Sequence, residues 1–488
     1  MNTRPVVVGI ASIQQKGKYD ELDEALIMMD KAVKGAVRDT GNKSIKDYID
    51  EIRVPKGFWK YRDPGKWIAK NNNFKRIPTT YVTKIGVLQQ SLINEACLKI
   101  QNGDIRASIV LGGEARYKML RSKIEDIPFY EKELTANPDY YVKAQEDLYG
   151  KDELEQLGAM AVGYYAVIET ALRKSKNEDL ESHREAIGEM YQNFSQIAAE
   201  NPNAWIDKPF TKEEIISESS KNRMMAYPYN KLHCTSWNVN QSSALIICSE
   251  ELADKLGIVD IKRVYPITSS ENNHMLAIQQ RPKLYKSLGM QYAAQKILEE
   301  IKRLKIDIDA YDLYSCFPAA VRMFLDALGI SKNKTISLSG SMAFAGGPLN
   351  SYVLHSSVEM IRKIRNGNIN NGLVTGVSGM MTKQSFCVWG KKSEDKFSFH
   401  DLTNKAKLEE KPLKILDEHQ GEGEIIGYTF FQDENKKIKA VLYLEDRNKR
   451  RKVISTFNKE FINLLSKEEW VGRNIFFKKD QLSSWKNN

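Results

Sequence analysis

The side chains in this sequence best suited to nucleophilic, acid–base or metal chemistry are five cysteines and six histidines. The cysteines stand singly in apolar surroundings, a pattern that indicates reduced, packed thiols and not a disulfide framework. Neither they nor the histidines have the spacing of a zinc site, so we expect no metal. The cysteines are Cys97, Cys234, Cys248, Cys316 and Cys387.

The overall composition is that of a globular protein with more than one structural unit. Its 488 residues are 42% hydrophobic, and no stretch approaches the about 20 apolar residues that cross a bilayer. We therefore expect a cytoplasmic protein without a membrane span. The net charge of +10 is spread along the chain, and its densest basic run, 447–452, is predicted to be a solvated turn. We expect an anionic metabolite, and not nucleic acid, as the ligand.

Strand and helix alternate along most of the chain, which predicts a largely parallel sheet covered by helices. Residues 5–13 form a continuous apolar run, typical of a buried strand, and residues 22–33 carry apolar side chains at helical spacing. In the second half we expect a helix over 284–304 and a strand over 310–317. The segment of about 116–229 is rich in helix formers, and we expect a helical insertion that caps the fold outside the sheet. Short alternating β stretches after Gly390 predict a small, barrel-like β domain.

A repeat at a separation of 264 residues (363 minus 99) indicates a duplication. Residues 99–112 read KIQNGDIRASIVLG and residues 363–376 read KIRNGNINNGLVTG, with seven identities in fourteen positions. Each copy predicts a helix end, a left-handed glycine cap and a buried strand. The alternative is two unrelated units with similar turns. If the duplication is real, the two helices begin near Gly86 and Asn350 and face one site.

The division that follows from this pattern is a first half at 1–260, a second half at 261–390 and a β domain at 391–488. The duplication, the glycine-rich turns and the order of elements resemble the thiolase superfamily over about residues 5–390. The extra β domain resembles the thiolase-like proteins type 1. The stretches that carry the resemblance are PYNKLHCTSWNVNQSSALIICS, YDLYSCFPAAV, SGSMAFAGGPLNSYVLHSSVEMI, GLVTGVSG and EEWVGRNIFF.

The resemblance implies a duplicated α/β fold with five alternating layers of helix and sheet. It implies acyl-coenzyme A as ligand or substrate, no bound cofactor, and a setting in lipid or acid metabolism. Because this family commonly pairs edge strands, the resemblance also implies a homodimer as one oligomeric state.

The resemblance places the family's reacting groups on residues that cannot perform their roles. The nucleophilic cysteine falls on Gly86, and the activating histidine falls on Gly347 of the GGPLN turn. The acid–base cysteine falls on Val377, and the Asn or His of the remaining motif falls on Tyr314. Loss of the nucleophile from such a unit typically costs on the order of 10⁶ in rate. We therefore expect no ordinary thiolase activity.

Three side chains remain as candidates for chemistry. Cys316 matches the cysteine of the family's H-D-C-F motif, Tyr314 precedes it by two positions, and His355 on the helix after GGPLN could approach the cleft as a base. Each candidate also has a structural interpretation, since Cys316 could be a small apolar filler and His355 could pack on the sheet.

The positions that the resemblance implies for acyl-CoA binding depend mostly on the backbone. The peptide N–H groups of Gly86 and Gly379 match the family's second oxyanion hole, and Ser236 matches a serine that contacts the pantetheine arm. The glycines would let a narrow chain approach the backbone closely. The full predicted set is Gly86, Ser236, Gly346, Gly347, Asn350, Ser378 and Gly379.

Three functions are consistent with these observations. The first is an acyl-CoA-handling protein, classed by fold as an acetyl- or acyltransferase, that lacks cysteine-dependent chemistry. The second is an acyltransferase on acyl-CoA thioesters with a rearranged site that uses Cys316 or Tyr314. The third is a non-enzymatic scaffold that acts through its C-terminal β domain.

Overall fold

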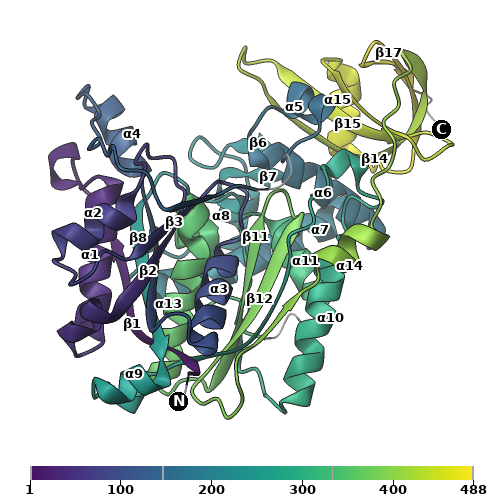
Figure 1. Cartoon of the computed structure of the whole chain (residues 1–488). Coiled ribbons are helices and arrows are strands. Elements are labelled where there is room, and N and C mark those ends of the chain that lie inside the picture. Colours follow the sequence, from purple (N-terminus) through teal and green to yellow (C-terminus); the bar gives the residue numbers. More distant parts are fainter. Residues whose placement is uncertain (1–2, 145–147, 332–333, 486–488) are drawn as a thin grey trace.

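The computed structural model describes residues 3–144, 148–331 and 334–485. Figure 1 shows five layers, in which two sheets enclose a central pair of helices and further helices cover both outer faces. The central helices are α3 (Gln89–Asn102) and α13 (Tyr352–Arg365). The outer layers include α1 (Ala25–Asp39) and α2 (Pro64–Asn71) on one side, and α10 (Leu288–Arg303) and α11 (Pro318–Leu328) on the other. The predicted layered α/β fold is confirmed.

The first sheet has the strand order β1-β8-β4-β2-β3-β5, and the second has the order β10-β11-β12-β9-β13. The first sheet contains β1 (Pro5–Gln14), β2 (Ile49–Pro55), β3 (Thr79–Thr83), β4 (Ala107–Ala115), β5 (Tyr140–Val142) and β8 (Asn240–Ser249). The second contains β9 (Tyr265–Asn272), β10 (Ala310–Asp312), β11 (Asn371–Ser378), β12 (Lys383–Gly390) and β13 (Ser398–Asp401).

The two sheets repeat one another strand by strand. In the first, β1 pairs antiparallel with β8, β8 antiparallel with β4, and β4 parallel with β2. In the second, β9, β12, β11 and β10 make the same pairings in the same order. The predicted repeat is therefore a duplication of the architecture and not a coincidence of turns.

The two central helices end with the same glycine conformation and the same capping hydrogen bond. Gly103 follows α3 with φ of 80°, and Gly367 follows α13 with φ of 74°, a left-handed conformation that glycine adopts without strain. The N–H of Asp104 donates to the carbonyl of Lys99, and the N–H of Asn368 donates to the carbonyl of Lys363. The same cap thus turns each helix into its strand.

The end of one strand and the start of one helix differ from those that the sequence predicted. The strand expected over 310–317 is only the three residues of β10, because the chain turns there toward the first turn of α11. The helix expected from Leu284 begins at Leu288, where the Ser287 hydroxyl accepts a hydrogen bond from the N–H of Met290. A serine cap therefore set this start, and apolar spacing alone missed it.

The insertion is largely helical, as predicted, but it also contributes to a sheet. Its helices are α4 (Arg116–Ile124), α5 (Lys151–Leu157), α6 (Ala161–Ser175), α7 (Leu180–Glu200) and α8 (Lys212–Ile216). Strand β5, however, pairs in parallel with β3 and covers its edge. The rings of Tyr81 and Tyr140 stack across this pair with centroids 4.7 Å apart. The expectation that the insertion lies outside the sheet was therefore wrong.

The C-terminal residues form a closed five-stranded barrel, as the alternating pattern predicted. The barrel contains β14 (Gln420–Gln432), β15 (Ile438–Glu445), β16 (Arg451–Thr456), β17 (Asn474–Lys478) and β18 (Gln481–Trp485), and it packs against α6. Thr170 on α6 exchanges two hydrogen bonds of 2.9 Å with the backbone of Tyr428. We keep the domain boundaries at 260 and 390 as a proposal. With these boundaries, β13 belongs to the C-terminal unit but pairs in parallel with β9 of the second sheet.

The basic run 447–452 is only partly the solvated turn that the sequence predicted. Arg451 and Lys452 lie in β16 and are buried. No helix in the described part of the chain is both long enough and apolar enough to cross a membrane.

Candidate functional site

The N-terminal ends of the two central helices meet in the middle of the molecule, as the duplication predicts. The side chain of Gln89, the first residue of α3, accepts a hydrogen bond from the N–H of Val353 and donates one to Asn350, each at 3.4 Å. Asn350 in turn donates its amide to the carbonyl of Lys56 at 3.0 Å. Gln89 therefore satisfies one of the N–H groups in the first turn of α13 that have no partner within the helix.

Gly86 lies just before α3 and next to the hairpin that follows β11. The amine of Lys383 donates to the carbonyl of Gly86 at 3.1 Å, and Lys383 pairs across this hairpin with Ser378. Gly86 has φ of 108° and Gly379 has φ of 67°. Both values lie in the left-handed region, so these positions favour glycine over any residue with a reactive side chain.

Ser236 is joined by hydrogen bonds to the GGPLN turn and to the short segment before it. The Ser236 hydroxyl donates to the carbonyl of Ala343 at 2.6 Å, and the N–H of Gly347 donates to the carbonyl of Ser236 at 2.9 Å. A side chain at Gly346 would collide with Gln241, and one at Gly347 would collide with Thr235. The close approach expected of these glycines is used here by the protein's own residues.

Cys316 and Tyr314 lie between β10 and α11 and are both buried. The hydroxyl of Tyr165, from α6, hydrogen-bonds to the Cys316 thiol and donates to the carbonyl of Gly379 at 3.4 Å. Burial raises the pKa of Cys316 to about 12, although the bond to Tyr165 opposes the shift. Burial also raises the pKa of Tyr314 well above its usual value. Neither group is a strong nucleophile near neutral pH.

His355 lies on the first turns of α13, facing β1. Its Nδ1 is 3.2 Å from the hydroxyl of Ser12, and burial lowers the pKa of the imidazole to about 3. The described residues contain no hydrogen bond between His355 and Cys316. The structure therefore does not join these two predicted candidates into a base–nucleophile pair.

The other cysteines resemble Cys316 in that each thiol has a raised pKa. Cys97, Cys248 and Cys387 are fully buried, and burial raises the pKa of all five thiols. Within the described ranges, no three His, Cys, Asp or Glu side chains gather in a way that could hold a metal ion.

Four residues in this region escaped the sequence analysis: Gln89, Tyr165, Lys383 and Glu271, which accepts a hydrogen bond from the Ser91 hydroxyl of α3 at 2.9 Å. Lys383 and Glu271 are buried in strands. Lysine and glutamate are rarely buried, so their presence in strands was the signal that could have found them. Tyr165 comes from the insertion, where the resemblance gives no motif. Gln89 follows Gly86 by three positions and looks like an ordinary helical residue.

Comparisons with known proteins support the fold. No family model and no curated protein matches the sequence. The structure is similar to a monomeric SCP2-thiolase like protein type 1 from Mycobacterium smegmatis, with a TM-score of 0.81 and 22% identity over 98% of this chain and 97% of that chain.

Two further solved structures match over 80% of this chain. An acetyl-CoA acetyltransferase from Syntrophomonas wolfei has a TM-score of 0.55 and 15% identity over 99% of its own length. The Ltp2-ChsH2(DUF35) aldolase has a TM-score of 0.58 and 16% identity over 98% of its own length. The chain therefore has the fold of the thiolase superfamily.

Proposed function

We propose that this chain binds acyl-CoA thioesters at the junction of α3 and α13 and does not catalyse cysteine-dependent thiolysis. The observation that carries the proposal is the meeting of two equivalent helix starts around Gln89 and Asn350, at a place where Gly86 offers no side chain. We further propose acyl or lipid metabolism in the cytoplasm as the setting.

Three properties of the region support binding without that chemistry. The N–H groups of Gly86 and Gly379 are independent of side-chain identity, so an oxyanion hole survives the loss of a nucleophile. The left-handed φ of Gly86 disfavours a cysteine at that position. The five cysteine thiols all have raised pKa values, which keeps them protonated.

One observation favours the second candidate, an acyltransferase with a rearranged site. Tyr165 links the Cys316 thiol to the carbonyl of Gly379, so Cys316 is one side chain removed from the proposed thioester site. Its raised pKa and its lack of contact with His355 weigh against it as a nucleophile.

The barrel offers less support for a nucleic-acid scaffold. Each of the five cations in 447–452 pairs with a carboxylate, so little positive charge is left for phosphates. A homodimer remains a prediction, and since β5 covers the edge of β3, such a dimer would have to use another edge.

Calorimetry with CoA and a panel of acyl-CoAs, with product analysis of the same samples, tests the proposal. We expect binding heat without thiolysis or acyl transfer. Ser378→Phe, which adds a buried ring at the end of β11 next to Gly379, should abolish binding, whereas Ser466→Phe at an exposed position of the C-terminal unit should not. Absence of binding in the wild type would refute the proposal. Turnover that is lost in Cys316→Ala would instead establish the rearranged site.

A further inference from the structure

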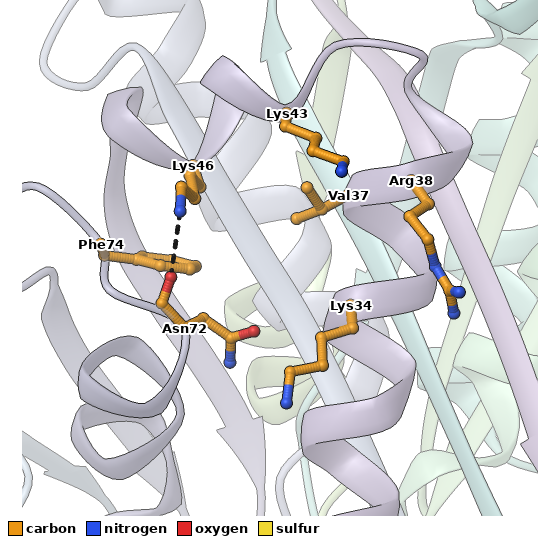
Figure 2. Close-up of a pocket in the computed structure, with 7 residues that line it drawn as sticks. All are labelled: Lys34, Val37, Arg38, Lys43, Lys46, Asn72 and Phe74. Carbon is orange, nitrogen blue, oxygen red and sulfur yellow. Dashed lines mark hydrogen bonds between the residues drawn. The ribbon is translucent and has the colours of Figure 1, made fainter.

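A basic hollow lies on the outer face of the first half, between α1, the short helix η2 (Lys43–Tyr48) and the loop after α2. Its volume is about 320 Å³. Figure 2 shows cationic side chains around it, with the Phe74 ring on one side and Arg38 on the far side, its guanidinium group turned away from Phe74. The lining residues are Lys34, Val37, Arg38, Lys43, Lys46, Asn72 and Phe74.

The charges of this hollow are poorly compensated by the protein. Lys34 pairs with Asp30 at 2.6 Å, and Lys46 donates to the carbonyl of Asn72 at 3.2 Å. Across the described residues, the side chains of Arg38 and Lys43 have no hydrogen bond or ion pair. Four cations and no carboxylate line the hollow, and an anion placed there would relieve their mutual repulsion.

The non-charged lining restricts the kind of anion. Phe74 presents a half-buried ring beside the cations, and Val37 closes the floor with a buried apolar side chain. A flat heteroaromatic ring can stack on such a surface, while lysine and arginine bind phosphate oxygens. The volume is at the lower end of the about 300–1,000 Å³ of small-molecule sites, which suits one nucleotide and not a long chain.

We propose that this hollow binds a nucleoside phosphate, with the base against Phe74 and the phosphates on Arg38 and Lys43. The hollow is on the α1 side of the first sheet, whereas α3 and α13 pack on the other side. The site is therefore separate from the junction proposed to bind the thioester, and it does not depend on that function.

Calorimetric titration of the full chain with ADP, and separately with inorganic phosphate, tests this site. Arg38→Glu and Lys43→Glu should each weaken ADP binding at least about tenfold, since each replaces an attraction by a repulsion. Phe74→Ala should weaken ADP binding but leave phosphate binding unchanged. Lys302→Glu on α10 makes the same change in net charge far from the hollow and should have little effect.

Three outcomes would overturn the proposal: no ADP binding by the wild type at millimolar concentration, an equal effect of Lys302→Glu, or an unchanged affinity in Phe74→Ala. Ser378→Phe separates the two sites, because it should leave ADP binding intact even where acyl-CoA binding is lost. A parallel titration with CoA tells whether its adenosine phosphate end can supply the ligand. CoA binding that survives Ser378→Phe and fails in Lys43→Glu would identify that source.

Discussion

The central helices α3 and α13 make the same contact with opposite halves of the molecule, but with different side chains. Ser91 of α3 donates its hydroxyl to Glu271 of β9 at 2.9 Å, whereas His355 of α13 lies 3.2 Å from the hydroxyl of Ser12 on β1. Ser91 and His355 are separated by the repeat distance of 264 residues (355 minus 91).

The strand partners of these two side chains are equivalent as well. Ser12 stands in the row Gly112, Ser243, Ser12 of the first sheet, and Glu271 stands in the row Gly376, Ser385, Glu271 of the second. Duplication has therefore preserved the positions while the residues diverged.

This difference shows that the two halves keep the same backbone arrangement although different titratable side chains occupy the equivalent positions. One copy of the contact buries an acid and the other buries a base, and burial shifts their pKa values in opposite directions. Burial raises the pKa of Glu271 to about 7 and lowers that of His355 to about 3.

The largest effect that we expect from this comparison is an acid-side loss of stability caused by His355. Its imidazole stays neutral in the folded state down to about pH 3, whereas the unfolded chain binds a proton below about 6.5. The free energy of unfolding should therefore fall as the pH drops below 6.5, by up to about 5 kcal/mol. Denaturant titrations of wild type and His355→Gln between pH 7 and 4 measure it; identical slopes would contradict the assignment.

Glu271 predicts a somewhat smaller effect of the opposite sign. Its carboxyl stays protonated in the folded state up to about pH 7, whereas the unfolded chain releases the proton above about 4.5. Stability should therefore fall as the pH rises from 4.5 to 7, by up to about 3 kcal/mol. The Glu271→Gln variant should lose this dependence and keep that of His355. A variant with the wild-type profile would show that Glu271 is ionised in the fold.

The two glycine caps should show the smallest effect and the closest agreement. Alanine at either Gly103 or Gly367 meets open space, so its cost comes only from the left-handed backbone. We expect each Gly→Ala change to lower the free energy of unfolding by about 1 kcal/mol, and each Gly→Asn change by less. Thermal unfolding of the four variants checks this, and costs that differ widely between the halves would break the proposed equivalence of the caps.

Features encoded locally were predictable from the sequence, and features that depend on long-range packing were not. The repeat predicted the two caps and the meeting of the helix starts, because glycine and helical spacing act within a few residues. The pairing of β5 with β3 was missed because three residues inside a helix-rich insertion carry no periodic signal. The contacts of Tyr165 and Lys383 with the candidate site join segments more than 200 residues apart (379 minus 165; 383 minus 86).

The most direct test of the central claim is a crystal structure of the protein with an unreactive ketone analogue of an acyl-CoA, in which a methylene group separates the sulfur from the carbonyl. The account predicts the analogue at the junction of α3 and α13, with its carbonyl oxygen about 3 Å from the N–H groups of Gly86 and Gly379 and with no covalent bond to a cysteine. An analogue bound elsewhere, or an acyl group from the parent thioester found on Cys316, would contradict it.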